Sequence, residues 1–240
     1  MRVVAFNSSP RDNETSKTEL VLQKFLEGIR RAGAVAETIY LRNYRVRHCL
    51  GCFACWVKTP GRCVKQDDMT EELFDRLLEA DLAVLATPLY HYNMNARMKA
   101  FIERTLPMNL PFFVDRRGRT DHPSRFQKVP RIVALSVCAF PEPATFKALS
   151  LTMKMIFGAQ LVAEIYSHSS EFLPILHQQI VHQAVKVLAA VARAGEEVVE
   201  NGKVSEATLE AVTEDLAPRE VLIKLANEHF KQELGRLPQE

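Results

Sequence analysis

The residues best suited to chemistry are four cysteines that lie close together. Cys49, Cys52, Cys55 and Cys63 follow the spacing C-x2-C-x2-C-x7-C, whereas Cys138 stands alone on a predicted buried strand. Three thiolates within one short segment can each bind one iron of a cubane, and a fourth after a longer loop can complete the site. Six side chains around them would offset the thiolate charge: Arg45, Arg47, His48, Lys58, Arg62 and Lys65. The segment therefore indicates an iron–sulfur site.

Two other interpretations of this segment stay open. Four-cysteine zinc sites usually consist of two separated C-x2-C pairs, whereas here the two pairs share Cys52. The thiols can also be redox groups, or part of a packed loop without metal. The seven-residue last gap, and Val64 after Cys63 where proline is common, depart from the usual ferredoxin run.

A second candidate site follows the first apolar run, residues 3–6. Hydroxyl, amide and guanidinium groups come just before a predicted helix, whose N-terminal amides and dipole favour an anion. The sequence lacks both the G-x-x-x-x-G-K-[ST] and the G-x-G-x-x-G pattern. A phosphate site or a helix-capping turn fits this segment, whose donors are Ser8, Ser9, Arg11, Asn13, Ser16 and Thr18.

A third candidate site follows the apolar run 82–86. Its residues are Pro88, Leu89, Tyr90, His91, Tyr92, Asn93 and Met94. Tyrosines at the mouth of a sheet can stack on a flat ring, while backbone amides reach the polar edge of that ring. The alternative is that these aromatic side chains only pack on the neighbouring helix. His91 is a weak candidate for a proton donor.

Strands and helices alternate along the sequence, which predicts a doubly wound α/β fold with a parallel sheet. Expected strands are 3–6, 35–41, 82–86, 132–138 and 161–166, and expected helices lie at 21–29, after Asp67-Asp68, after Asn95 and at 146–157. In such a sheet ligands bind beyond the carboxyl ends of the strands. The candidate loops after the first and third strands lie at that edge.

We expect residues 1–170 to form this domain, with a cysteine-rich loop at 42–66, and residues 171–240 to form a helical extension of it. The apolar periodicity of the extension predicts helices at 180–188 and 221–230. This extension is more apolar than a solvated tail requires. It therefore covers the sheet or forms a subunit contact.

Composition points to a protein of the cytoplasm with no nucleic-acid or membrane partner. The net charge of +2, from 31 basic and 29 acidic residues, creates no strong field. The N-terminus lacks the apolar core of a signal peptide, and no stretch reaches the roughly 18 apolar residues that span a bilayer. We find no Ser-His-Asp arrangement, so hydrolase chemistry is not indicated.

Three groups of motifs together resemble a known family. They are Ser8-Ser9-Pro10-Arg11 with Ser16-Lys17-Thr18; the four cysteines with Asp67-Asp68-Met69; and Thr87-Pro88-Leu89-Tyr90 with Met98-Lys99-Ala100-Phe101-Ile102-Glu103-Arg104. The sequence resembles the flavodoxin-like NAD(P)H-dependent FMN reductases, and more closely the iron–sulfur flavoproteins among them. The resemblance covers roughly the first 165 residues. Many family members have glycine at the position of Ser8, so the phosphate contacts differ in detail.

The resemblance implies a flavodoxin-like, five-stranded parallel sheet of order 2-1-3-4-5 and two cofactors, FMN and a [4Fe–4S] cluster. FMN phosphate would be held by the first loop, and the flavin ring by Pro88, Leu89, Tyr90, Asn93 and Met94, with Ser136 approaching its other side. The cluster ligands would be Cys49, Cys52, Cys55 and Cys63.

The implied activity is electron transfer between a one-electron donor, such as a ferredoxin, and a two-electron acceptor, such as a quinone or an oxygen species. A cluster-free NAD(P)H-dependent FMN or quinone reductase and a non-enzymatic redox or metal sensor are the alternatives. By analogy with the family we expect a homodimer or homotetramer.

Overall fold

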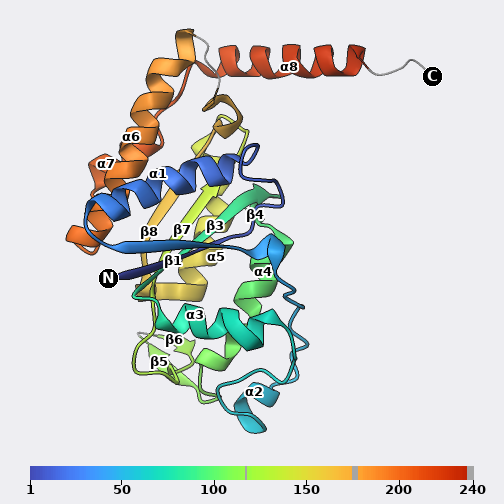
Figure 1. The fold of residues 1–240 in the computed structure, drawn as a ribbon, viewed down its shortest axis with the longest axis vertical. Coiled ribbons are helices and arrows are strands. Elements are labelled where there is room, and N and C mark those ends of the chain that lie inside the picture. The colour runs from blue at the N-terminus through green and yellow to red at the C-terminus, as the bar shows by residue number, and fades with distance from the viewer. Residues whose placement is uncertain (117, 175–177, 237–240) are drawn as a thin grey trace.

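A parallel β-sheet forms the centre of the molecule (Figure 1). The computed structural model describes residues 1–116, 118–174 and 178–236. The parallel strands run in the spatial order β2-β1-β3-β7-β8 and are β2 (Val35–Tyr40), β1 (Arg2–Asn7), β3 (Leu82–Tyr90), β7 (Arg131–Val137) and β8 (Leu161–Ser167). Residues 3–6 of β1 and 82–86 of β3 are buried, because both faces of the sheet are covered. The predicted α/β fold is confirmed.

Three short strands were missed by the sequence prediction. β4 (Asn93–Met94) pairs antiparallel with β3 and adds a sixth strand to the sheet. β5 (Val114–Arg116) and β6 (Arg119–Asp121) form a separate hairpin. The predicted order 2-1-3-4-5 therefore describes the parallel strands alone and does not match the full sheet. Segments of two or three residues are too short to show the alternation that indicates a strand.

Helices cover both faces of the sheet (Figure 1). On one face lie α1 (Lys17–Arg31), α6 (Gln178–Glu200) and α7 (Glu206–Val212); on the other lie α3 (Phe74–Glu79), α4 (Ala96–Glu103) and α5 (Lys147–Phe157). Each face has its own apolar core. Phe25 and Val191 belong to the first core, and Phe101 and Met153 to the second.

Helices α1 and α6 approach each other through their backbones. A Cβ atom added to Gly28 of α1 would lie 1.7 Å from the carbonyl oxygen of Ala192, and one added to Gly195 of α6 would lie 2.1 Å from that of Phe25. Only glycine permits so close a contact. Helix α6, in the predicted C-terminal extension, therefore packs directly on the helix that follows β1.

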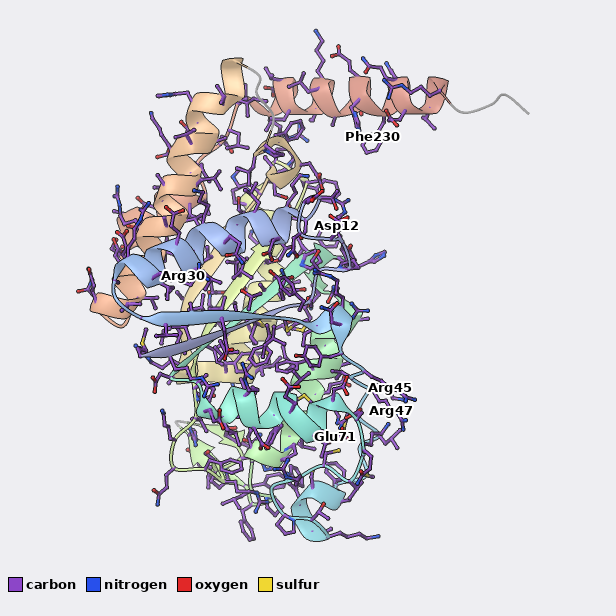
Figure 2. All side chains as sticks on the ribbon, in the orientation of Figure 1. Asp12, Arg30, Arg45, Arg47, Glu71 and Phe230 are labelled. Carbon is purple, nitrogen blue, oxygen red and sulfur yellow. The ribbon has the colours of Figure 1, made fainter. Side chains whose placement is uncertain are left out.

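The end of the chain forms a projecting helix, α8 (Arg219–Gly235), which extends away from the sheet (Figure 1). Leu222 at its start is buried, whereas Phe230 is exposed on its surface (Figure 2). Residues 175–177 and 237–240 of the predicted extension lie outside the described residues. The domain boundary at residue 170 stays a prediction.

Short helical segments complete the fold: α2 (Ala54–Val57), η1 (Leu41–Asn43), η2 (Met69–Leu73), η3 (Leu106–Met108), η4 (Pro143–Phe146), η5 (Gly158–Gln160) and η6 (Ser170–Phe172). Asp68, in the predicted capping pair Asp67-Asp68, holds the N-cap position of η2, but its side chain makes no capping hydrogen bond. Its carboxylate accepts from the amide of Arg45 instead, and that of Asp67 binds Arg104. None of the helices within the described ranges combines the length and the apolar character that crossing a bilayer requires.

Candidate functional site

The loop after β1 is built around the N-terminus of α1. Ser16 caps this helix, since its Oγ accepts a hydrogen bond from the amide of Glu19 at 3.1 Å. The same hydroxyl donates to Oγ of Ser9 at 2.8 Å, and Ser9 Oγ accepts from the amide of Arg11 at 3.3 Å. The two serines are buried, and Arg11 is exposed. Polar hydrogens are thus gathered at the positive end of a helix, where an anion is stabilised.

The loop after β3 is tied to this first loop by a buried asparagine. Asn95 caps α4 by accepting from the amide of Met98 at 3.0 Å, and its Nδ2 donates to the carbonyl oxygen of Ser8 at 2.8 Å. The amide of Ser8 in turn donates to the carbonyl of Ala86 at 2.9 Å. The predicted cap at Asn95 is confirmed. It fixes the distance between the two loops.

The tip of the β3–β4 hairpin has an unusual backbone. His91 and Tyr92 both have positive φ, at 47° and 63°, between the paired residues Tyr90 and Asn93. A two-residue turn of this kind favours Asn-Gly, since glycine adopts positive φ without steric cost. Bulky residues there store strain, of the order of 1–3 kcal/mol each, and such strain gathers at ligand sites.

The two loops and the end of β7 enclose one cavity of about 230 Å³. Seven of the twelve predicted cofactor residues line it: Ser9, Arg11, Ser16, Thr18, Pro88, Leu89 and Tyr90. Lys17, Cys138 and Glu171 also line it, although the sequence analysis did not assign them to the site. Glu171 follows β8, so the only sequence signal for its role was its position just after the fifth predicted strand. The cavity lies at the sheet edge where the fold predicts a ligand.

The other five predicted cofactor residues do not line this cavity in the described structure. Ser8 and Ser136 are buried, and their hydroxyls donate to the carbonyls of Ala86 and Thr87. Asn93 donates to Thr152, Met94 is buried in the second core, and Asn13 contacts Tyr40 and Arg42. His91 does not line the cavity either.

A carboxylate lies across the mouth of the cavity. Glu171 pairs with Arg11 at 3.0 Å and with Lys17 at 3.6 Å. The three side chains are partly exposed, so these pairs contribute little to stability. An anionic ligand could therefore take the place of Glu171 beside both cations.

A larger cavity, of about 630 Å³, lies between α4, α5 and the β5–β6 hairpin, and none of the predicted site residues lines it. Phe101 and Ile132 are part of its floor, while Arg116 and Asp121 stand at its rim 3.6 Å apart. Because these opposite charges offset each other, the rim favours neither anionic nor cationic ligands. The smaller cavity is the better candidate.

The four clustered cysteines lie on one partly exposed loop, which contains α2. Cys55 is buried, Cys52 is exposed, Cys49 and Cys63 are half-buried, and all are free thiols. Burial raises the pKa of Cys55, and the neighbouring thiols of Cys63, Cys49 and Cys52 raise this pKa further. Figure 2 shows Arg45 and Arg47 projecting outward at the start of this loop.

The thiols do not converge on one point. Across the part of the chain that the structure describes, no three His, Cys, Asp or Glu side chains are arranged to hold a metal ion. The donor set nevertheless suits iron or zinc, because thiolates are soft ligands. The backbone around them contains three residues with positive φ, Gly51 at 62°, Phe53 at 52° and Gly61 at 86°. The chemistry of the loop, rather than its geometry, fits a cluster.

Comparison with known families decides where the chain belongs. A family model described as NADPH-dependent FMN reductase matches residues 1–128, more than half of the chain and the part that carries all three candidate loops. The chain belongs to the NADPH-dependent FMN reductase family. The resemblance inferred from the sequence is confirmed.

Within the NADPH-dependent FMN reductase family, the chain is similar to proteins named iron–sulfur flavoprotein. One from Archaeoglobus fulgidus is 35% identical over 107 residues, which are 45% of this chain and 46% of that protein. One from Methanocaldococcus jannaschii is 30% identical over 112 residues, which are 47% and 55% of the two chains. The chain thus spans about half the length of these relatives.

Solved structures of low sequence identity share the fold. An NAD(P)H:quinone oxidoreductase from Methanothermobacter marburgensis has a TM-score of 0.59 at 18% identity, over 82% of this chain and 96% of the other. An FMN-dependent NADH-azoreductase from Bacillus anthracis, solved in complex with FMN, has a TM-score of 0.56 at 14% identity, over 83% and 98%. At such identities the likeness concerns the fold alone.

Proposed function

We propose that this protein is an FMN-dependent electron-transfer oxidoreductase of the cytoplasm, in which Cys49, Cys52, Cys55 and Cys63 hold a [4Fe–4S] cluster. The observation that carries the proposal is the family match over residues 1–128, which contain both the cavity loops after β1 and β3 and the cysteine loop. Bound FMN accepts one or two electrons, so it couples a one-electron donor to a two-electron acceptor. A ferredoxin or NAD(P)H would be the donor, and a quinone or an oxygen species the acceptor.

The phosphate of FMN would bind at the N-terminus of α1. The hydroxyls of Ser9, Ser16 and Thr18 are buried there, and Arg11 and Lys17 supply positive charge. The phosphate would replace the Glu171 carboxylate as the partner of both cations. This exchange keeps the cations paired in the free and the bound protein.

The flavin ring would lie against the loop after β3. Pro88 and Leu89 offer apolar surface, and Tyr90 is 47% exposed beside them. A ring that stacks on Tyr90 would cover this exposed surface. The strained turn at His91 and Tyr92 directly follows this surface.

The cluster is supported by the donor set and by the relatives. Four free thiols lie on one loop, and their thiolates are the ligands that iron–sulfur clusters take. Several relatives that share this region are named iron–sulfur flavoprotein. In the assembled protein, a homodimer or homotetramer would be the form in which the cluster and FMN work together.

A cluster-free NAD(P)H-dependent FMN or quinone reductase is the second candidate. It is favoured by one observation, which is that the described thiols do not converge on a metal position. In this case the flavin would be reduced by NAD(P)H, and the cysteine loop would be a structural or redox-active segment.

Anaerobic purification followed by iron and flavin analysis separates the two candidates. The first predicts FMN with about four irons per chain. Alanine in place of Cys49, Cys52, Cys55 or Cys63 should remove or convert the cluster and leave most of the FMN bound, whereas Cys138→Ala should keep the iron. Protein that contains FMN but no iron and four titratable loop thiols would refute the cluster and favour the second candidate.

A further inference from the structure

A buried ion pair lies at the base of the cysteine loop, residues 42–66. Arg104, at the end of α4, binds both carboxylate oxygens of Asp67, with Nη1 to Oδ2 at 2.7 Å and Nη2 to Oδ1 at 2.9 Å. The side chains are 1% and 0% exposed. Arg104 is the largest fully buried side chain of the described structure. Every other ion pair that the described residues form has at least one partly exposed partner.

This pair also binds the backbone at the start of the loop. Nη1 of Arg104 donates to the carbonyl of Arg47 at 2.9 Å, and the amide of Arg47 donates to Oδ2 of Asp67 at 3.0 Å. Nη2 of Arg104 also donates to Oγ1 of Thr70 at 2.9 Å. Because Arg47 precedes the first cysteine by two residues and Asp67 follows the last by four, the pair joins both ends of the cysteine segment.

The guanidinium also has one buried donor that none of these contacts uses. The Nε of Arg104 is buried and has no hydrogen-bond partner among the described atoms. A buried donor without a partner is costly, and a negatively charged sulfur is a suitable acceptor for it.

We propose that Arg104 and Asp67 form a clasp that closes the cysteine loop and holds its two ends together for the metal centre. The metal in this statement rests on the proposed function, whereas the closure of the loop does not. Stability alone does not account for the pair, since an apolar pair of similar volume is often as stable as a buried ion pair. An apolar pair in place of Arg104 and Asp67 would make none of the hydrogen bonds to the backbone of Arg47.

Arg104→Lys tests the clasp, because lysine keeps the positive charge but lacks the planar fork that binds two carboxylate oxygens and a carbonyl at once. In metal-free protein the variant should expose the buried Cys55 to alkylation about tenfold faster or more, the factor expected when a charge-assisted hydrogen bond is lost. After anaerobic reconstitution its affinity for iron should fall about 10- to 100-fold, as for lost outer partners of metal ligands.

Lys24→Gln is the control. Lys24 also forms an ion pair on a helix, with Glu27 at 2.9 Å, but this pair lies on α1 and both side chains are partly exposed. Its loss should leave the alkylation of Cys55 and the uptake of iron at wild-type values. FMN content, measured in parallel, shows that each variant retains the fold around the flavin site.

The outcomes separate the clasp from the cluster. Wild-type alkylation of Cys55 in Arg104→Lys overturns the clasp, whether or not iron binds. Faster alkylation with unchanged iron affinity overturns the role of the clasp in metal binding. If wild-type protein binds no iron, the proposed cluster fails and the alkylation rates alone decide the clasp. If Arg104→Lys does not fold, Asp67→Asn is judged by the same measurements.

Discussion

The backbone contact between α1 and α6 leads to a sharp prediction for Gly28→Ala. A methyl group at this position would lie 1.7 Å from the carbonyl oxygen of Ala192, whereas real Cβ contacts stay beyond 3.0 Å. The helices would have to separate by roughly 1.3 Å, which forfeits about half or more of the dispersion energy of the contacting atoms. Val187 and Val191, buried on α6, would lose part of their contact.

The magnitude follows from two opposing effects. Overpacking of this kind costs about 1–3 kcal/mol, and occasionally more. Alanine offsets at most about 1 kcal/mol of this through its higher helix propensity. Because the clash is with a backbone atom, we expect the upper end of the difference, a net loss of about 2 kcal/mol, which lowers the urea midpoint by about 0.5–1 M at the m-value of a protein of this size.

Gly235→Ala provides the control, since Gly235 is also helical but has nothing within 4 Å of an added Cβ. This variant should unfold at the wild-type midpoint or slightly above it. Urea unfolding followed by circular dichroism measures both variants. A wild-type midpoint for Gly28→Ala would refute the close approach of the helices, and with it the packing of α6 on α1.

Further predictions concern single side chains. Asn95→Ala should lower stability by about 2 kcal/mol and weaken FMN binding, because it removes a cap and a link between the two cavity loops; urea unfolding and fluorescence titration measure these effects. Burial alone would raise the pKa of Asp67, but hydrogen bonds from Arg104 hold it below its ordinary value of 3.8. The stability difference between wild type and Asp67→Asn should thus be constant above about pH 5 and narrow as the pH falls below 4; urea midpoints that show no narrowing would contradict this. Burial raises the pKa of Cys138 to about 11, so iodoacetamide at pH 8 should label it far more slowly than Cys52 in metal-free protein, as peptide mapping by mass spectrometry would show; equal rates would be the contrary result.

The parallel core could be predicted from the sequence because its signals are local. Residues 82–86 form a continuous apolar run, and Asn95 stands just before a periodic apolar segment, where a cap belongs. The hairpin of β5 and β6 gave no such signal, because its strands have three residues each. In this protein the local sequence pattern therefore predicts strands of five or more residues but not the shorter ones.

The candidate site was predicted less completely, because part of it depends on long-range contacts. Hydroxyls near the N-terminus of α1 are visible in the sequence, whereas Glu171 reaches Arg11 only through the placement of β8. Asp67 looked like a cap, but its carboxylate binds a side chain 37 residues away. Such a distant partner cannot be predicted from the spacing of residues in the sequence. The burial of both charged side chains distinguishes an ion pair from a helix cap.

The fixed ends of the cysteine loop bear on how this protein can evolve. The segment between Arg47 and Asp67 is anchored at both ends, so changes within it need not alter the sheet. Doubling the length of a loop with fixed ends costs only about 0.6 kcal/mol. Insertions, deletions or exchanged ligands can therefore accumulate there while the strand register and the cavity loops are inherited unchanged. A metal site could be gained, altered or lost by descendants of one ancestor without a change of fold.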